Sequence, residues 1–333
     1  MFKKYNPSQF QGSKTKKGYF EGWYYKLVDA SEELAFAIIA GISLPKEKEK
    51  SHAFIMVFDA RNHEMNYFKF DIDEFEASKS EFKLKIADNF FSHHQLHLNL
   101  NKDSLQIKAR LDFKNITPWP VSVFSPGVMG WYSFVPFMEC YHGVLSFNHQ
   151  VNGYVEINNQ KKDFNKGKGY LEKDWGTSMP SSWIWMQSNH FEDENASLFG
   201  SIAKIPWLKN YFTGFIFGFL LNGRLFKFST YNRSHIKKLK VDHERIIIEV
   251  SNKNHRLKID AERTKGVDLP APSQGEMTSK VNESLNSKIK LKLYDNNNNN
   301  NNKKNKLIFE GTGRNSGLEF VGDIQELIKG IKK

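Results

Sequence analysis

The sequence predicts an all-β fold, and three observations support this class. Aromatic residues make up 14% of the 333-residue chain and include 28 Phe, and aromatic side chains favour the pleated surface of a sheet. Apolar and polar residues alternate in successive runs along residues 82–113, as they do in strands with one buried face. Asn-Gly pairs at 152–153 and 222–223 are typical of tight hairpin turns. Together these features favour antiparallel strands closed into barrels.

The first barrel is expected over residues 18–165, after a flexible basic arm at residues 1–17. It opens with an aromatic strand, followed by a continuous apolar run at 34–42 that is typical of a fully buried strand. Asn152-Gly153 predicts a hairpin between strands at 144–147 and 154–157. The intervening strands are predicted at 53–58, 65–70, 82–86, 96–100 and 105–113.

The second barrel is expected over residues 166–333. Asn222-Gly223 predicts a hairpin, and the Pro- and Gly-containing stretch 267–275 predicts a long surface loop. The Asn-rich stretch 295–306 is predicted to be a disordered insertion. Residues 322–333 place apolar side chains at helical spacing, which predicts a short C-terminal helix.

The composition argues against several classes of protein. A single cysteine, Cys140, excludes an internal disulfide framework and indicates a reducing compartment, so a cytoplasmic location is expected. No apolar run reaches the roughly 18–20 residues of a membrane helix, and no signal or transit peptide is evident. The formal charge of +11 is scattered over apparent loops, which argues against a nucleic-acid partner. Peripheral contact with an anionic membrane is the alternative to a merely solvated surface. The oligomeric state is not predicted.

The stretch Gly169–Phe191 concentrates the residues that could carry chemistry. It contains Trp175, Trp183 and Trp185 together with a charged run at 172–174. Large aromatic side chains this close in sequence predict a buried aromatic wall. Charges at such a wall either stay at its rim or have shifted pKa values.

Carboxylates stand beside aromatic residues in three places: Glu21 with Trp23, Glu139 with Tyr141, and Glu172 and Asp174 with Trp175. A carboxylic acid kept neutral by an apolar pocket can protonate an alkene, and aromatic faces stabilise the cation that forms. The alternative is a set of salt bridges or hydrogen bonds at strand ends. The residues alone leave both interpretations open.

No metal site, cofactor or covalent nucleophile is predicted. His93, His94 and His97 fall on both faces of one strand and have no Cys or acidic neighbour. Phosphate-binding loop motifs are also missing. Cys140 and His142 share a strand face at positions i and i+2, but a lone cysteine is more often a small core residue than a nucleophile.

Four segments resemble the tocopherol cyclase family: 18–26 (GYFEGWYYK), 131–146, 169–191 with EKDWG and WIWMQSNHF, and 267–275 with LPAPSQG. The resemblance extends over roughly residues 18–330. It implies two consecutive lipocalin-like β-barrels, a fold shared with carotenoid hydratase-like and Diels–Alderase-like proteins. It also implies closure of a prenylated quinol to a chromanol without a cofactor, the chemistry of vitamin E, and hence a hydrophobic isoprenoid ligand.

The resemblance implies roles for individual residues. Asp174 or Glu172 would protonate the prenyl double bond, with Glu139 as a further candidate. His142 or His190 would assist loss of the phenolic proton. The residues expected to line the substrate site are Trp175, Trp183, Trp185, Trp131, Tyr132, Glu21, Trp23 and Tyr141. Two alternatives use the same kind of closed apolar pocket: a non-catalytic carrier of a hydrophobic ligand, and a hydratase or pericyclase.

Two places differ from the plant cyclase pattern. Asp174 stands where the plant proteins have Asn, and residues 139–142, Glu-Cys-Tyr-His, stand where they have Glu-Pro-His-Trp. Because these positions include proposed catalytic groups, the plant substrate does not carry over directly.

Overall fold

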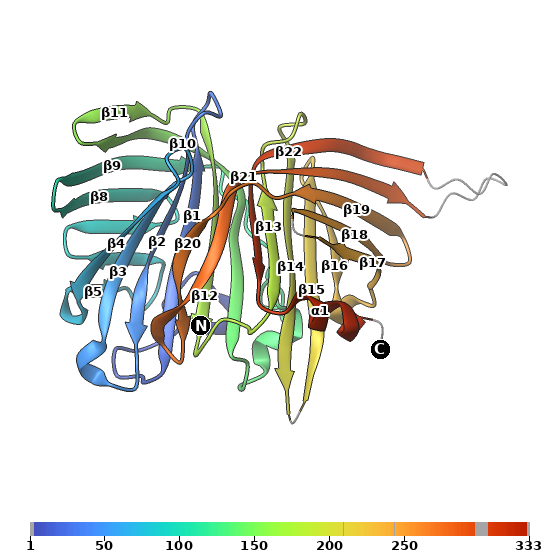
Figure 1. Cartoon of the computed structure of the whole chain (residues 1–333), viewed down its shortest axis with the longest axis horizontal. Helices are drawn as coiled ribbons and strands as arrows, with labels where there is room; N and C mark the ends of the chain where they lie inside the picture. Colours follow the sequence, from blue (N-terminus) through green and yellow to red (C-terminus); the bar gives the residue numbers. More distant parts are fainter. Residues whose placement is uncertain (1–2, 209, 243, 297–305, 332–333) are drawn as a thin grey trace. The chain divides into compact units, whose positions relative to one another are not determined.

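A computed structural model describes residues 3–208, 210–242, 244–296 and 306–331. The chain divides into two compact units: Met1–Met179 with Asp268–Lys280, and Pro180–Val267 with Val281–Lys333. Each unit is built mainly from one antiparallel sheet (Figure 1), although residues 268–280 of the first unit belong to strands of the second sheet. The all-β class with one short C-terminal helix is therefore confirmed.

The first sheet has 12 strands in the order β4-β3-β2-β1-β12-β10-β9-β8-β7-β6-β5, with β11 paired to β10. Among the described residues the edge strands β4 and β5 do not pair with each other, so this barrel is open. The strands are β1 (Tyr19–Val28), β2 (Ala35–Leu44), β3 (His52–Asp59), β4 (Glu64–Asp71), β5 (Phe75–Ala77), β6 (Lys83–Ile86), β7 (Asn89–Ser92), β8 (Gln95–Lys102), β9 (Leu105–Lys114), β10 (Cys140–Ile157), β11 (Gln160–Asp163) and β12 (Gly167–Gly176).

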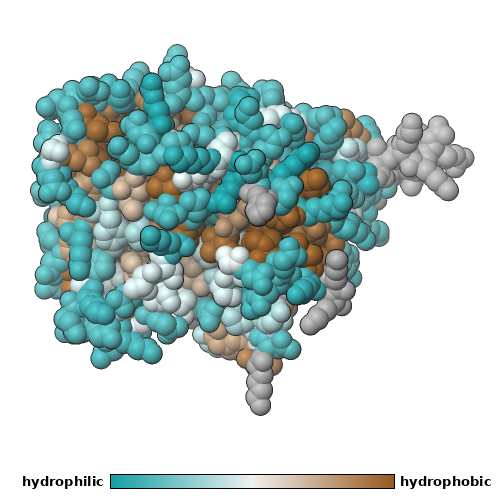
Figure 2. Space-filling model, viewed as in Figure 1, coloured by the Kyte–Doolittle hydropathy of each residue, from teal (hydrophilic) through white to brown (hydrophobic). Residues whose placement is uncertain are grey.

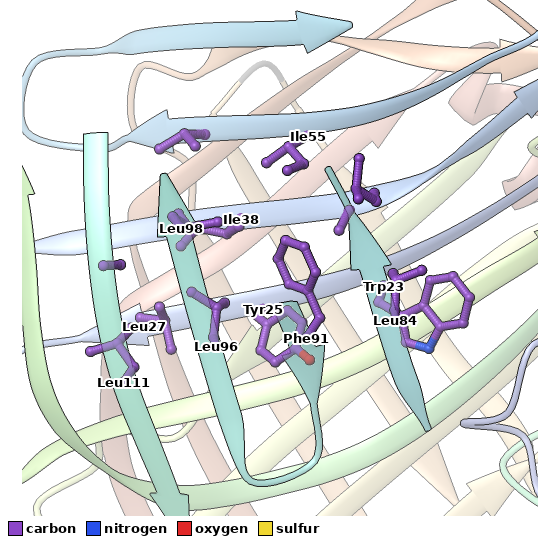
Figure 3. Close-up of a cluster of buried hydrophobic side chains, with 14 of the residues drawn as sticks. Trp23, Tyr25, Leu27, Ile38, Ile55, Leu84, Phe91, Leu96, Leu98 and Leu111 are labelled. Atoms are coloured by element: carbon purple, nitrogen blue, oxygen red, sulfur yellow. The ribbon is translucent and has the colours of Figure 1, made fainter. Parts of the chain in front are cut away.

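Side chains from distant strands of this sheet meet in one core (Figure 3). Trp23, Tyr25 and Leu27 alternate along β1, and all three belong to the core cluster. Ile55 of β3 and Leu98 of β8 join the same cluster although their strands are far apart in the sheet. The sheet therefore wraps around an interior that these apolar side chains fill, and burial of apolar surface is its main source of stability.

Part of the N-terminal arm is held firmly on this unit. Trp23 Nε1 donates a hydrogen bond to the carbonyl of Ser8 at 2.9 Å. Lys173 Nζ donates to the carbonyls of Pro7 at 3.0 Å and Gln9 at 2.6 Å. The prediction of a flexible arm is therefore wrong for this part. The polar sequence of the arm indicates only that the arm forms no strand. It does not reveal that Trp23 and Lys173, which lie farther along the chain, bind the backbone of the arm.

A second prediction, the hairpin at Asn152-Gly153, is wrong. Asn152-Gly153 lies inside the continuous strand β10 and forms no hairpin. Gly153 has φ +123°, and a Cβ there would lie 2.0 Å from the carbonyl oxygen of Arg110. The glycine is therefore needed for close approach to β9. The turn that leads from β10 to β11 uses Asn158 and Asn159 instead, both with positive φ.

His149 of β10 lies in an apolar interior. It is 1% exposed, and neither ring nitrogen has a hydrogen-bond partner among the described residues. Its ring lies 4.9 Å from that of Phe113, and a Cβ on Gly169 would lie 2.2 Å from its Nε2. Burial, with a smaller contribution from the charge of His93, lowers the pKa of His149 to about 3. Burial also lowers the pKa of His93 to about 4.

We expect these histidines to make the fold sensitive to acid. An unfolded histidine binds a proton near pH 6.5, whereas the folded pair stays neutral until the pH approaches 4. The unfolded state therefore binds more protons between these values, and stability falls as the pH drops below about 6.5. Urea unfolding at pH 7 and pH 5 should show a loss that shrinks by about 2 kcal/mol in His149→Leu. The exposed control His63→Asn should lose as much as the wild type. An unchanged loss in His149→Leu would contradict this assignment.

The second sheet has 10 strands in the order β16-β15-β14-β13-β22-β21-β19-β18-β17, with β20 paired to β21. Its core cluster includes Met186, Phe217 and Leu291, and Leu327 of the helix belongs to it. Asn222-Gly223 forms the predicted hairpin, with φ of 49° and 76°. The elements are β13 (Trp183–Ser188), β14 (Ala196–Trp207), β15 (Asn210–Leu221), β16 (Arg224–Ser229), β17 (His235–Val241), β18 (Arg245–Ser251), β19 (His255–Glu262), β20 (Val267–Ser273), β21 (Glu276–Asp295), β22 (Lys306–Val321) and α1 (Ile324–Ile331).

Three boundaries differ from the expected ones. The stretch predicted as a long loop contains β20, since a proline is tolerated in a strand where no ladder hydrogen bond needs its nitrogen. The chain passes to the second unit after Met179, later than the expected junction at 165/166, because β12 pairs with β1 and β10. Most of the predicted Asn-rich insertion, residues 297–305, lies outside the described residues.

The face drawn in Figure 2 is mainly hydrophilic, and hydrophobic residues gather on it in several patches. Among the described residues there is no helix of the length and apolar character that crossing a bilayer demands.

Candidate active site

The candidate site lies on the outer face of the first sheet. Strands β10 and β12 pair so that His142 is directly opposite Asp174 and Val144 opposite Glu172. Successive side chains of a strand point to opposite faces. Leu171 belongs to the core, so Glu172 and Asp174 face away from it, on the side of His142.

His142 lies between the two carboxylates. Its Nδ1 is 2.7 Å from Asp174 Oδ1, and its Nε2 is 3.5 Å from Glu172 Oε2. The hydroxyl of Tyr170 donates a hydrogen bond to the same Glu172 oxygen. Glu172 is the more enclosed of the two carboxylates, with a side chain 6% exposed against 22% for Asp174. We call these three side chains, carboxylate–imidazole–carboxylate, the His142 group. Its Asp174 end is the more accessible to solvent.

This arrangement sets the charge of the imidazole. Burial by itself would lower the pKa of His142, but the negative charges of Asp174 and Glu172 and the hydrogen bond with Asp174 outweigh it and raise the pKa to about 9. His142 is therefore an imidazolium at neutral pH. Burial, followed by the charge of Glu172, raises the pKa of Tyr170 well above its ordinary value, so this hydroxyl stays neutral and acts as a donor.

Sulfur atoms border the site. The sulfur of Met129 accepts a hydrogen bond from the backbone N–H of His142 at 3.1 Å. Cys140 Sγ lies 3.8 Å from Asp174 Oδ1 and 3.9 Å from Met179 Sδ. Burial and the charge of Asp174 raise the pKa of Cys140 well above its ordinary value. A neutral thiol is a poor nucleophile. Cys140 therefore forms part of the apolar boundary of the site.

The same three residues could hold a metal ion. The ligand atoms of His142, Glu172 and Asp174 all lie within 4.8 Å of one another. Imidazole and carboxylate ligands suit several divalent metals. A cation would have to displace the proton of His142, because a histidine binds metal in its neutral form.

The inner face of the same sheet carries a buried ion pair between β1 and β12. Glu21 and Lys173 are both fully buried, with Glu21 Oε1 2.5 Å from Lys173 Nζ. Glu21 also accepts hydrogen bonds from the backbone of Gln11 at 2.8 Å and Gly12 at 2.9 Å, and from the hydroxyl of Tyr19. Every charge of the pair is thus bonded within the protein.

Two tryptophans complete this inner cluster. Lys173 Nζ lies 4.6 Å from the ring centre of Trp23 and 4.7 Å from that of Trp175, so both rings make cation–π contacts. Tyr141 stacks on Trp175 at 5.6 Å. These contacts hold Glu21, Trp23 and Trp175 around the ammonium of Lys173. Contrary to the expected wall around Asp174, Trp175 lies on the opposite face of β12.

The other expected residues of the first unit lie in the turn before β10 or at the start of that strand. Trp131 and Tyr132 stack at 4.1 Å in the short 3₁₀ turn η4 (Gly130–Phe134), where Trp131 is 45% exposed. The backbone carbonyl of Glu139 accepts from Thr177 at 2.8 Å. The hydroxyl of Tyr141 donates to the carbonyl of Val135.

The remaining expected residues belong to the second unit. Trp183 and Trp185 lie on β13, and both are 6% exposed. Nε1 of Trp183 donates to Glu319 Oε2 at 2.6 Å. His190 is 3% exposed, and its carbonyl accepts from the N–H of Arg314 at 2.9 Å.

Sequence reasoning missed Tyr170 and the role of Lys173. Tyr170 shares a strand face with Glu172 and Asp174, so the spacing 170, 172, 174 could have revealed it. The partners of Lys173 on the arm are more than 160 residues away in the chain, and no local pattern marks them.

A groove of about 400 Å³ lies elsewhere on the first unit, between Phe36, Arg61, Asn62 and Ile157 among others. It contains none of the expected site residues.

Comparison with known proteins identifies the family. Residues 89–322, well over half of the chain, match the family described as "Tocopherol cyclase-like". A 200-residue segment is 24% identical to a probable tocopherol cyclase, chloroplastic, of Oryza sativa subsp. japonica, covering 58% of this chain and 42% of that protein. A 103-residue segment is 26% identical to the chloroplastic tocopherol cyclase of Zea mays, covering 30% and 22%. The chain thus spans less than half the length of these relatives.

Solved structures show the same fold. Two crystal structures of CghA, one with Sch210972, each give a TM-score of 0.55 at 8% identity over 92% of this chain and 89% of theirs. A putative AttH from Nitrosomonas europaea gives 0.49 at 12% identity over 91% and 92%. The likeness to CghA confirms the fold class, and the family match assigns the sequence. The chain belongs to the tocopherol cyclase-like family.

Proposed function

We propose that this protein is an isomerase that closes a prenylated quinol to a chromanol by proton transfer. The observation that carries the proposal is the placement of His142 between Glu172 and Asp174 on one sheet face. Membership of the tocopherol cyclase-like family supports this substrate class.

The proposed reaction is balanced without an oxidant or reductant. A proton adds to the CH carbon of the prenyl double bond nearest the ring and leaves a tertiary cation. The phenolic oxygen attacks the cation and forms the new C–O bond, and the phenolic proton is lost. One proton enters and one leaves, so the product is an isomer of the substrate.

The His142 group suits this proton balance. In the proposal, the imidazolium of His142 passes its proton to Asp174, and Asp174 gives that proton to the alkene because its end of the group is more accessible. Glu172 takes up the phenolic proton, directly or through Tyr170, which is hydrogen-bonded to it. His142 contacts both carboxylates, so it takes this proton from Glu172 and is again an imidazolium for the next turnover. General acid–base catalysis of this kind contributes about 10²–10⁴ in rate.

The cation needs an apolar, electron-rich surround. Met129, Cys140 and Met179 supply polarizable sulfur around His142 and Asp174. Trp183, Trp185 and His190 of the second unit remain predictions as substrate contacts.

The test is turnover of prenylated hydroquinones of several chain lengths by the purified protein in D₂O. We expect one enantiomer of a chromanol that carries a single deuterium on the methylene carbon derived from the alkene CH. Heat-denatured protein is the control for uncatalysed closure. A racemic product, or none at any chain length, would reject cyclisation. Ligand-dependent quenching of Trp fluorescence without turnover would identify a carrier instead.

A further inference from the structure

The loop between β9 and β10 is unusually apolar. Residues 115–138 include no Asp, Glu, Lys or Arg, although these residues make up 26% of the chain. In the part of the chain that the structure describes, ten large hydrophobic residues are exposed. Six of them lie in this loop: Val121, Val123, Phe124, Trp131, Phe134 and Phe137. We call residues 115–138 the apolar segment. Exposed apolar surface gathered in one place indicates an interaction site.

The tip of the apolar segment is held open. Ser122 and Ser125 exchange backbone hydrogen bonds of 2.9 and 3.1 Å. The turn between them presents Val123, 68% exposed, and Phe124, 84% exposed. The backbone hydrogen bonds of this turn hold both side chains in solvent. They can therefore insert into an apolar environment that a binding partner provides.

The N-terminal arm places a lysine, Lys4, next to this surface. The hydroxyl of Tyr5 donates a hydrogen bond to the carbonyl of Val123 at 3.0 Å, which ties the N-terminus to the tip. Lys3 and Lys4 are both exposed. Lys4 Nζ lies 5.6 Å from the ring centre of Phe134, whereas Lys3 Nζ lies 5.9 Å from that of Phe10. A cation thus borders an apolar surface whose own sequence has no charge, and a second exposed lysine precedes it in the chain.

We propose that the apolar segment docks on an anionic lipid bilayer, with Val123 and Phe124 entering the acyl boundary and Lys3 and Lys4 at the headgroups. Apolar side chains bordered by lysines bind such interfaces through buried apolar area and attraction to anionic lipid. Trp and Tyr favour the headgroup level, where Trp131 and Tyr132 of the same segment would lie. The chain's formal charge of +11 adds long-range attraction to the same surface.

The surface adjoins the candidate site. The segment continues into β10, which carries His142, and its Met129 contacts the His142 backbone. A prenylated quinol partitions into lipid, so docking here would bring the site to its substrate. Vesicle binding requires no turnover, so failure of this inference and failure of the proposed reaction are distinguishable.

The test is co-sedimentation of the full chain with phosphatidylcholine vesicles, with and without about one third phosphatidylglycerol. We expect the partition coefficient to be larger on the anionic vesicles, with a blue shift of Trp emission. The double variant Val123→Ser/Phe124→Ser should bind at least tenfold more weakly, given the apolar area it removes. Lys3→Ala/Lys4→Ala should lose on the order of tenfold on anionic vesicles only.

The matched control is Leu307→Ser, since Leu307 is 45% exposed and lies on the second unit. It should bind as the wild type does. Three results would overturn the proposal: no binding to anionic vesicles, equal binding by the Val123→Ser/Phe124→Ser variant, or an equal loss in Leu307→Ser. Self-association in solution that disappears in the tip variant, without vesicle binding, would identify a second copy as the occupant.

Discussion

Asp174→Asn is expected to lower the turnover of a prenylated hydroquinone by about 10²–10⁴, the usual contribution of a positioned acid–base group. The amide keeps the shape of the carboxyl and a contact with His142, but it cannot give a proton to the alkene. Binding, followed by Trp fluorescence, should change little. The control Asp112→Asn replaces an exposed carboxylate on β9 of the same sheet and should keep full turnover.

The pH profile gives a second measurement of the same variant. His142 loses its proton as the pH rises through about 9, so turnover should fall above that pH. Asp174→Asn removes one of the charges that raise this pKa, so the residual activity should begin to fall at lower pH. Wild-type turnover in Asp174→Asn, with an unmoved alkaline limb, would exclude Asp174 as the acid.

Lys173→Met is expected to destabilise the protein by about 3–5 kcal/mol, because it leaves the buried charge of Glu21 uncompensated. It also removes the hydrogen bonds to Pro7 and Gln9, so limited proteolysis should cut the N-terminal arm sooner. Urea unfolding measures the free energy. The double variant Glu21→Leu/Lys173→Met should lose less than Lys173→Met alone, since no buried charge remains.

The surface pair Lys50–Glu276 provides the control for the buried pair. Its atoms lie 3.1 Å apart, but the two side chains are 51% and 34% exposed. Exposed pairs contribute little to stability, so Lys50→Met should unfold in urea close to where the wild type does. If Lys173→Met were equally mild, the Glu21–Lys173 pair would not anchor the arm.

Local patterns predicted the elements that local chemistry controls. The apolar run at 34–42 became β2, buried almost throughout, and Asn222-Gly223 became a hairpin because both residues adopt positive φ readily. Asn152-Gly153 carries the same dipeptide, yet it lies inside β10. There Gly153 serves close approach to Arg110 of β9, a requirement that comes from a neighbouring strand and not from the dipeptide.

The sequence by itself determined the all-β class, the family and the stretch around Asp174 that carries the candidate site. Only the tertiary structure decided which side chains meet. Strand pairing set His142 opposite Asp174 and, by alternation, sent Trp175 to the opposite face, beside Lys173. Pairing register depends on contacts between segments far apart in the chain, and a shift of one residue would exchange the two faces. Local periodicity shows which residues share one face of a strand, but it does not show which residues of other segments that face contacts.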